Sequence, residues 1–377
     1  VLVSKVTVYT DEGHASPVET SSSYTFYSGK VQPSQMVITL AAVLTTQNGS
    51  GVSATTTQKF DLLGNLTEST DERGLKTAYS YDIFTGAMTQ SILDVGGQNL
   101  TTDFEIDAKG RTTQTLGPVH EAVIGGIAKQ IRIATWTTYY EFTNKVTTAS
   151  GYAEGTAPNY TFTLVNPVSI TISNNNGNVQ EQIQATRAST TGKLLPTDVF
   201  NQSSYVRWTT NQYQQCCRIS STRSYFLIPT SGVGTEGTNY NTTSFGYDQM
   251  GRRNQTTSPG GTITFTVFDE RSLVSAVYVG TDATGATETD PTGATESDST
   301  GPAESESPGP PDTDSTEGQA AGNNMVLVTQ NEYDNGVAGR DGNLTSTWAW
   351  VDGSTSRQTE IAYDFRNRQT SVAGEEN

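Results

Sequence analysis

A few short segments of this chain carry residue types that could do chemistry. The stretch "GVGTEG" at 232–237 has the spacing of a dinucleotide-binding loop, in which glycines let the backbone approach a pyrophosphate. That chemistry requires a helix after the loop, so that its N-terminus meets the phosphate. The following "TNYNTTSFGYD" is a poor helix former, so the sequence favours a loop that holds no nucleotide.

Metal and nucleophile signatures are equally incomplete. His120 opens like a zinc-binding H-E-x-x-H motif, but Ile124 stands at the fifth position and His14 is the only other histidine. "DTDSTEG" from Asp312 starts like a calcium loop, but Glu317 occupies the position that requires glycine. There is no G-x-S-x-G nucleophile motif. We therefore predict no catalytic, cofactor-binding or metal residues and no enzyme activity.

The charge of the chain is concentrated in one segment. The net charge is −17, and residues 281–320 hold ten Asp or Glu and no Lys or Arg. This balance argues against a nucleic-acid surface, which needs clustered basic residues. The Pro, Gly, Ser and Thr content of 281–320 predicts an acidic, disordered insertion. Diffuse, weak calcium binding by its carboxylates stays open as an alternative.

The elements that must position any functional residue are short and polar. Only 33% of residues are hydrophobic, and the longest apolar run, "MVITLAAVL" at 36–44, is too short to span a bilayer. Such a composition suits many strands with one buried and one wet face. Cys216 and Cys217 are adjacent and would point to opposite faces of a strand, so we expect inert thiols, with a vicinal disulfide or a crosslink as the alternative.

One motif recurs seven times: an aromatic or aliphatic residue, an aspartate, a few turn residues, then a Thr/Ser/Val-rich run. Its copies are about 20–30 residues apart once the acidic insertion is set aside, the length of one β-hairpin. Asp at the first and Gly at the last position of "DQMG" favour a type I turn. The residues of these predicted structural corners are Phe60, Asp61, Gly64, Tyr81, Asp82, Gly86, Asp107, Gly110, Arg111, Tyr247, Asp248, Gly251, Arg252, Phe268, Asp269, Tyr333, Asp334, Tyr363 and Asp364.

The segments between corners alternate in the manner of strands. In "TITFTVF", Ile263, Phe265 and Val267 face one way and the threonines face the other. The fold class predicted is therefore all-β, with antiparallel β-hairpin repeats stacked into a spiral, solenoid- or shell-like sheet. We expect one continuous array over 1–377, with clear units near 60–120 and 245–377 and degenerate units over 121–244.

The segments "GYDQMGRRNQTTSPGGTITFTVFDERSLV", "EYDNGVAGRDGNLTSTW" and "AYDFRNRQTSVAG" resemble the RHS/YD-repeat family, the hairpin arrays of bacterial Rhs and Tc toxin proteins and of teneurins. Less regular segments resemble the interior arrays of large secreted YD-repeat proteins of planctomycete-type bacteria. The resemblance implies a spiral β-sheet that often closes into a hollow shell. The aspartyl self-cleavage element and cargo domain of toxin-bearing members are not found here.

Three functions follow from this resemblance and the residues. The first is a structural segment of a large secreted or cell-surface protein, forming a β-sheet shell, fibre or adhesive scaffold. The second is part of a cocoon that encapsulates a toxin encoded downstream. The third is carbohydrate binding by exposed aromatics, Trp136, Trp208, Trp348 and Trp350. The expected partners are flanking repeats of the same polypeptide or identical copies, with an encapsulated toxin or surface glycans in the alternatives, and neither nucleic acid nor a membrane span.

Overall fold

The computed structural model describes residues 5–9, 17–214, 217–287, 323–337, 341–351 and 355–374. Within these ranges the chain forms 23 β-strands, a few 3₁₀ turns and no α-helix. Neighbouring strands pair antiparallel, so the all-β prediction is confirmed. The chain divides into two compact units, residues 1–177 with 182–206, and residues 178–181 with 207–377. Most of the predicted acidic insertion, from residue 288 on, lies outside the described residues.

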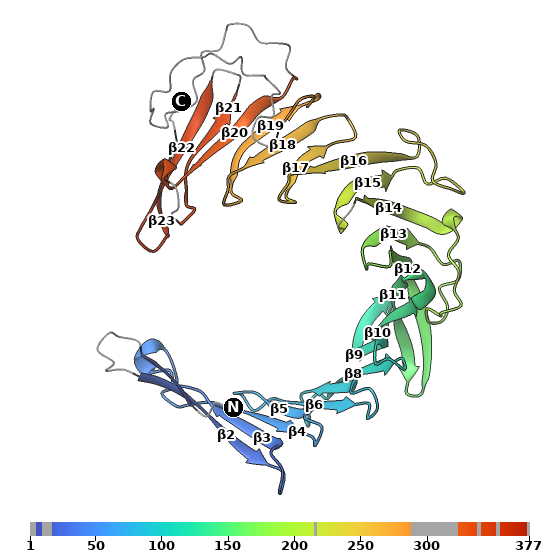
Figure 1. The fold of residues 1–377 in the computed structure, drawn as a ribbon. Coiled ribbons are helices and arrows are strands. Elements are labelled where there is room, and N and C mark those ends of the chain that lie inside the picture. Colours follow the sequence, from blue (N-terminus) through green and yellow to red (C-terminus); the bar gives the residue numbers. More distant parts are fainter. Residues whose placement is uncertain are drawn as a thin grey trace. The chain divides into compact units, whose positions relative to one another are not determined.

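The first unit is a run of strands in which each strand pairs with the next in the chain, seen in order in Figure 1. These strands are β1 (Lys5–Tyr9), β2 (Pro17–Phe26), β3 (Pro33–Thr39), β4 (Thr55–Phe60), β5 (Leu66–Thr70), β6 (Lys76–Tyr81), β7 (Met88–Leu93), β8 (Leu100–Ile106), β9 (Thr112–Ile124), β10 (Ile127–Tyr140), β11 (Lys145–Thr156) and β12 (Asn159–Ser173). Three 3₁₀ turns, η1 (Thr45–Gln47), η2 (Glu141–Thr143) and η3 (Gln202–Ser204), lie in its connections.

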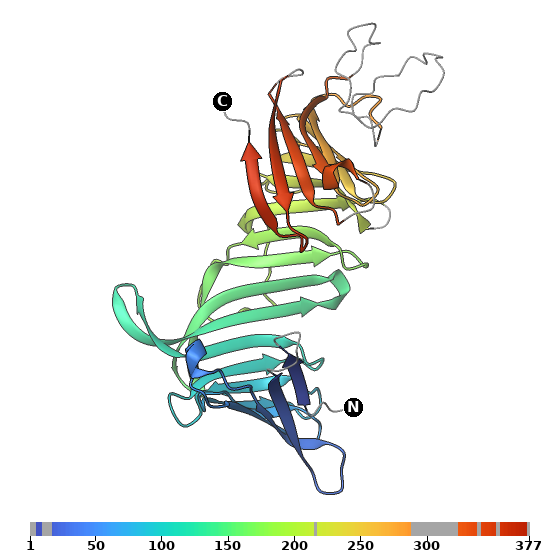
Figure 2. The same cartoon turned by 90° about the vertical axis from the view of Figure 1, so that its left-hand side faces the viewer.

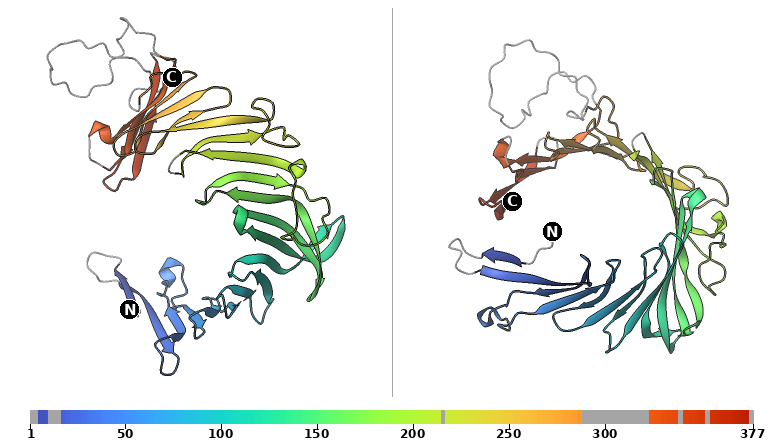
Figure 3. Two further views of the ribbon diagram at one scale, coloured as in Figure 1. Left: turned by 45° about the vertical axis from the view of Figure 1, so that its right-hand side comes forward. Right: turned by 60° about the horizontal axis from the view of Figure 1, so that its bottom comes forward.

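The second unit repeats the same arrangement, as the views in Figure 3 show for the yellow to red strands. β13 (Val179–Ala185) and β14 (Tyr205–Tyr213) contribute residues to both units. The remaining strands are β15 (Ile219–Tyr225), β16 (Tyr240–Tyr247), β17 (Arg253–Thr257), β18 (Ile263–Phe268), β19 (Val274–Gly280), β20 (Val326–Tyr333), β21 (Leu344–Trp350), β22 (Ser356–Tyr363) and β23 (Gln369–Gly374), with the 3₁₀ turn η5 (Asp334–Gly336) after β20.

The apolar core of the first unit lies on its longest strands. β9 to β12 have 12 to 15 residues each and stand out in Figure 2. Ala134, Trp136, Leu164 and Val168 on these strands are almost fully buried. Longer strands present more inward-facing positions per hairpin, which is why the burial concentrates there.

In the second unit the predicted alternation is confirmed on β18. Ile263, Phe265 and Val267 are buried and pack with Met325, while Thr262 and Thr264 are exposed and Thr266 is half-buried. A sheet with one buried and one wet face produces this pattern.

The turns at the two edges of each unit differ in length. Because successive strands run antiparallel, every second turn lies along the same edge. The turns after β4, β6, β8, β16, β18 and β22 have only five or six residues, and they include most of the predicted corners. The turns at the opposite edge include the long connections 40–54, 226–239 and 281–325. The longest connections thus lie on the edge opposite to most of the predicted corners.

Candidate functional site

The corner at Asp248 shows how each repeat turns. The Gly251 N–H donates to the Asp248 carbonyl at 2.9 Å, and the Asp248 N–H donates to the Arg252 carbonyl at 3.0 Å. The Asp248 carboxylate accepts the Arg252 N–H at 2.8 Å and pairs with the Arg252 guanidinium. Asp248 is only 5% exposed, so its charge is satisfied entirely by the turn that it closes.

Four more predicted corners share this bond pattern. In each, the aspartate N–H donates to the carbonyl four residues on, and the residue three positions on donates back to the aspartate carbonyl. One carboxylate oxygen accepts two backbone N–H groups, from the residues two and four positions on. These corners are centred on Asp61, Asp107, Asp269 and Asp364.

The residue three positions after the aspartate is left-handed in every one of these corners. Gly251 has φ +83°, and the equivalent positions hold Ser272 at +68° and Asn367 at +58°. Glycine reaches this region without a Cβ penalty, and asparagine tolerates it. The corner thus requires a positive φ at this position, and glycine adopts a positive φ most readily.

Two predicted corners are larger versions of the same turn. Asp82 spans one extra residue, with the Gly86 N–H on its carbonyl and Thr85 on its carboxylate. Asp334 opens η5, and its carboxylate accepts the N–H groups of Gly342 and Asn343. In both, the aspartate still closes the turn through its side chain.

At four turns, a tyrosine at the end of one strand is hydrogen-bonded to the preceding strand. The hydroxyl of Tyr247 donates to the Ile219 carbonyl at 2.9 Å, and Ile219 is the first residue of β15. Tyr81, Tyr213 and Tyr333 make the same bond to the first residue of the preceding strand, namely to Leu66, Val179 and Val274. The strand pairing also shifts register at this residue, between Gly246 and Tyr247 for example, which marks a β-bulge.

Arginines connect one corner to the next along the same edge. Arg252 pairs with Asp248 in its own corner, donates to the Asp269 carbonyl at 2.9 Å, and lies 4.6 Å from the centre of the Phe268 ring. Arg271, in the Asp269 corner, pairs with Asp334 at 2.7 Å and lies over Tyr333. We call this series of arginine, carboxylate and aromatic contacts the corner ladder.

The corner ladder is also present in the first unit. Arg111 pairs with Asp107 at 2.6 Å and with Glu141 of the next turn at 2.6 Å, and it lies 4.0 Å from the Tyr139 ring centre. Alternate strands of a sheet are about 10 Å apart, a gap that only a long cationic side chain crosses. Arginine suits this role because its guanidinium both pairs with a carboxylate and stacks on a ring.

The pKa values of three corner carboxylates, those of Asp107, Asp248 and Asp364, lie below the ordinary range of an aspartate. Burial alone would raise the pKa of Asp248, but its Arg252 partner and the backbone N–H groups outweigh burial and lower it. The Arg368 and Arg111 guanidinium groups lower the pKa of Asp364 and Asp107. All three aspartates are therefore charged at neutral pH, as the ladder requires.

Several corners have no aromatic–Asp signature. Asp71 follows Thr70, yet it makes the same backbone and carboxylate bonds as Asp61. Gln214 donates its N–H to the Arg218 carbonyl, and Ser258 closes the turn before β18 through its hydroxyl. The Asp-x-x-Gly spacing of "DERG" would have located Asp71, whereas Gln214 has no such signal.

The isolated chemical motifs do not assemble into a site within the described residues. The stretch 232–237 runs into β16 and is followed by no helix. His120 is exposed, its Nδ1 lies 3.3 Å from the Pro118 carbonyl oxygen, and His14 lies outside the described residues. Cys217 is a free, exposed thiol, and Cys216 is among the residues not described. Across the described ranges, no group of three or more His, Cys, Asp or Glu is placed to hold a metal ion.

The tryptophans offer little surface for a sugar. Trp136 is 2% exposed and donates its Nε1 to Gln114, while Trp208 is 8% exposed and donates to Glu181. Trp348 and Trp350 on β21 are half-buried. In the part of the chain that the structure describes, no helix is long and apolar enough to cross a membrane.

The fold and the ladder define an antiparallel β-hairpin repeat protein. Residues 60–98 match the family model described as RHS Repeat, a stretch that begins at the Asp61 corner and includes the Asp82 corner. No curated protein gives a match.

Solved structures similar to this chain include a Tc holotoxin pore of Photorhabdus luminescens that carries a TccC3 mutation, at 12% identity and a TM-score of 0.30, over 95% of this chain and 18% of that one. The TcdB2-TccC3-Cdc42 crystal structure matches at 9% identity and a TM-score of 0.27, over 99% of this chain and 20% of that one. The chain thus spans about a fifth of the length of these structures.

Proposed function

We propose that this chain is a non-catalytic structural segment of a large secreted or cell-surface YD-repeat protein, a continuous hairpin array that contributes to a shell, fibre or adhesive scaffold. The observation that carries the proposal is the corner ladder. Its carboxylates and arginines bond to the chain's own backbone and to each other. Groups committed in this way stabilise a fold and are not available for turnover.

The proposed partners are further repeats. Among the described strands, β1 pairs only with β2 and β23 only with β22, so each leaves one edge of backbone groups without a strand partner. Uncovered edges of this kind pair readily with another strand. Flanking repeats of the same polypeptide or identical copies would supply it.

The test is to compare folding with activity in the purified chain. We expect β-sheet circular dichroism, cooperative denaturant unfolding, and no turnover in hydrolase or redox assays. Asp248→Ala should lower the free energy of unfolding, and the variant should show the same lack of turnover as the parent chain. Reproducible turnover that His120→Ala abolishes would overturn the non-catalytic assignment.

Encapsulation of a toxin encoded downstream is the alternative, and the RHS Repeat match over 60–98 supports it as well as it supports a scaffold. The encapsulation and scaffold functions can be distinguished by isolating the protein from its natural host. A second polypeptide that co-purifies, resists protease and becomes digestible only when the β-sheet is unfolded would establish the cocoon. Assemblies that contain nothing but repeats would establish the scaffold.

A further inference from the structure

Large apolar side chains project from successive turns along one edge of the first unit. The turns after β2, β4, β6, β8 and β10 share this edge because successive strands run antiparallel. We call these five turns, 27–32, 61–65, 82–87, 107–111 and 141–144, the apolar rim. Turn residues are ordinarily polar or glycine. Four of these five turns instead carry large apolar residues that are 57% to 104% exposed: Val31, Leu62, Leu63, Ile83, Phe84 and Phe142.

Contacts within the chain hold the turns of the apolar rim side by side. The Tyr27 hydroxyl donates to the Phe60 carbonyl at 2.6 Å, and the Tyr81 hydroxyl bonds to β5. Lys109 pairs with Glu141 of the next turn at 2.9 Å. Alternate strands of a sheet are about 10 Å apart, so the tips form an evenly spaced row. A row that is ordered before it binds loses little conformational entropy on docking.

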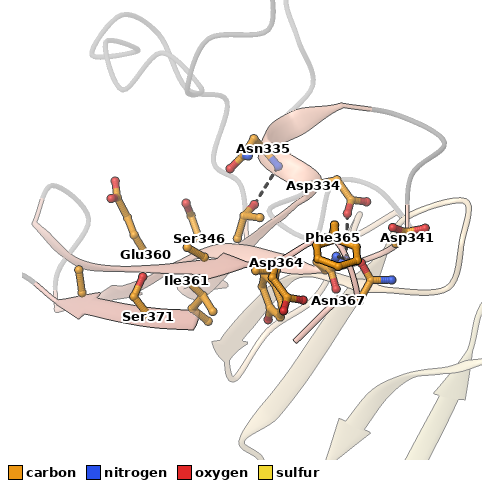
Figure 4. A pocket seen from close by; sticks show the side chains of 15 residues that line it. Asp334, Asn335, Asp341, Ser346, Glu360, Ile361, Asp364, Phe365, Asn367 and Ser371 are labelled. Carbon is orange, nitrogen blue, oxygen red and sulfur yellow. Dashed lines mark hydrogen bonds between the residues drawn. The ribbon is translucent and has the colours of Figure 1, made fainter. Parts of the chain in front are cut away.

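The described turns on the corresponding edge of the second unit form no such row. Their tips mix single apolar residues with polar or charged ones, as in the pairs Gln249–Met250 and Phe365–Arg366. Figure 4 shows Phe365 in the turn after β22, and the Arg366 guanidinium lies 5.1 Å from its ring centre. Burying such a tip would also take the charge beside it out of water, which is costly. The apolar rim is thus particular to the first unit.

A second copy of the apolar rim fits these apolar side chains. In a twofold-symmetric dimer, the row meets its own copy running in the opposite direction. If the twofold axis lies at the middle turn, Ile83 and Phe84 meet the same residues of the partner copy. The first turn then meets the fifth, which places Val31 against Phe142. Apolar residues therefore cover each other at the centre and at both ends of the row.

The charges at the tips match in the same register. Lys30 in the first turn meets Glu141 in the fifth turn of the partner copy. Lys109 and Glu141 pair within the chain, but their side chains stay 61% and 53% exposed, so each can also contact the partner copy. Moving the axis between the second and third turns would instead place Lys30 against Lys109, a like-charge contact that opposes binding. The charges thus favour the register that the apolar residues fit.

We propose that the apolar rim of the first unit forms a symmetric dimer with the apolar rim of a second copy of this chain, with the twofold axis at the turn 82–87. The interface uses neither of the uncovered edge strands, β1 and β23, so it does not depend on the proposed scaffold function. A lipid surface would also cover the apolar tips, but it would give no role to the opposite charges at the two ends of the row.

Sedimentation of the purified chain over a range of concentrations tests the proposal. We expect a reversible equilibrium between monomer and dimer. Ile83→Ser combined with Phe84→Ser should weaken the dimer about tenfold or more, because residues at the twofold axis are lost from both copies. Lys30→Glu should weaken it about twofold to fivefold, and Glu141→Lys in the same chain should restore part of that loss. Phe365→Ser, at an exposed tip of the second unit, is the matched control and should leave the dimer unchanged.

Disulfide cross-linking tests the register independently of the serine variants. With Cys216 and Cys217 replaced by serine, Phe84→Cys should cross-link to itself under an oxidant. Val31→Cys should cross-link to Phe142→Cys only when the two variant chains are mixed. A monomer at every concentration, or binding to phosphatidylcholine vesicles without a dimer, would overturn the proposal. So would a dimer that the rim substitutions leave intact, since that result would place the contact elsewhere, as on the edge strands.

Discussion

At the scale of single residues, the corner aspartate combines two roles that proteins often separate. It caps the turn through its backbone and anchors an arginine through its carboxylate. Loss of Asp248 would leave the backbone N–H and the side-chain Nε–H of Arg252 without their acceptors. The penalty for such orphaned donors exceeds the net value of one hydrogen bond.

We therefore expect Asp248→Ala to lower the free energy of unfolding by about 2 kcal/mol. Denaturant unfolding followed by circular dichroism measures this change. Glu121→Ala, which removes an exposed carboxylate from a strand, is the matched control and should be near neutral. Equal losses for the two variants would contradict the role assigned to Asp248.

Acid should weaken the fold through the same aspartates. Because the pKa of Asp248, Asp107 and Asp364 is lowered on folding, their contribution is complete above the unfolded value of about 3.9 and is lost as pH falls through the folded values. Urea midpoints should be constant between about pH 7 and pH 5 and then fall. Asp248→Asn should flatten that fall. A wild-type midpoint that rises on acidification would refute this reading.

The left-handed position gives a second residue-scale prediction. Gly251→Val should cost about 1–2 kcal/mol, because a β-branched residue is strained at φ +83°. Gly251→Asn should cost much less, since Asn367 already occupies the equivalent place in the last corner. Comparing the unfolding free energies of the two variants tests the conformation directly. Equal costs would show that space around Gly251, rather than φ, decides.

At the scale of elements, a tyrosine hydroxyl bonds one strand to the strand before it at four of the turns. Tyr247→Phe keeps the ring and removes only the bond to the Ile219 carbonyl, so we expect a loss of about 1 kcal/mol. Tyr363 leads the last corner, but its hydroxyl has no hydrogen-bond partner among the described residues. Tyr363→Phe is therefore the control and should be silent in the same unfolding measurement. A loss there equal to that of Tyr247→Phe would be evidence against the hydroxyl bond.

The elements also show which features could be predicted from sequence. Alternation predicted the buried face of β18, and the recurring pair of an aromatic residue, or once Ile106, with an aspartate predicted seven turns, because the residue types that make those features are restricted. The turns at Asp71 and Gln214 were not predicted, because neither follows the aromatic–Asp pattern. Backbone hydrogen bonds close both turns, and these bonds require neither an aromatic residue nor a carboxylate. The arginine links between corners could not be predicted, since they join residues about 20 to 60 positions apart, such as Arg271 and Asp334.

At the scale of the whole molecule, the acidic insertion is closed at its base by described residues. Asn324 accepts the N–H groups of Thr281 and Asp282, and β19 pairs directly with β20. Deleting residues 288–321 should thus leave the melting temperature unchanged or slightly raised, because a shorter loop costs less entropy to close. A fall of many degrees would show that the insertion contributes packing. Asn324→Ala in the parent chain, which opens the base, should lower the melting temperature instead.

The unequal lengths of the turns determine where this polypeptide can accept inserted residues. A residue added inside a five-residue corner such as 248–252 would pull an arginine away from the next corner, whereas one added within 226–239 would leave every ladder contact in register. Tags, epitopes or whole domains should therefore be accepted in long connections such as 40–54 and 226–239 and refused in the five-residue corners. For protein engineering, these long connections are the positions at which the array can display an inserted sequence.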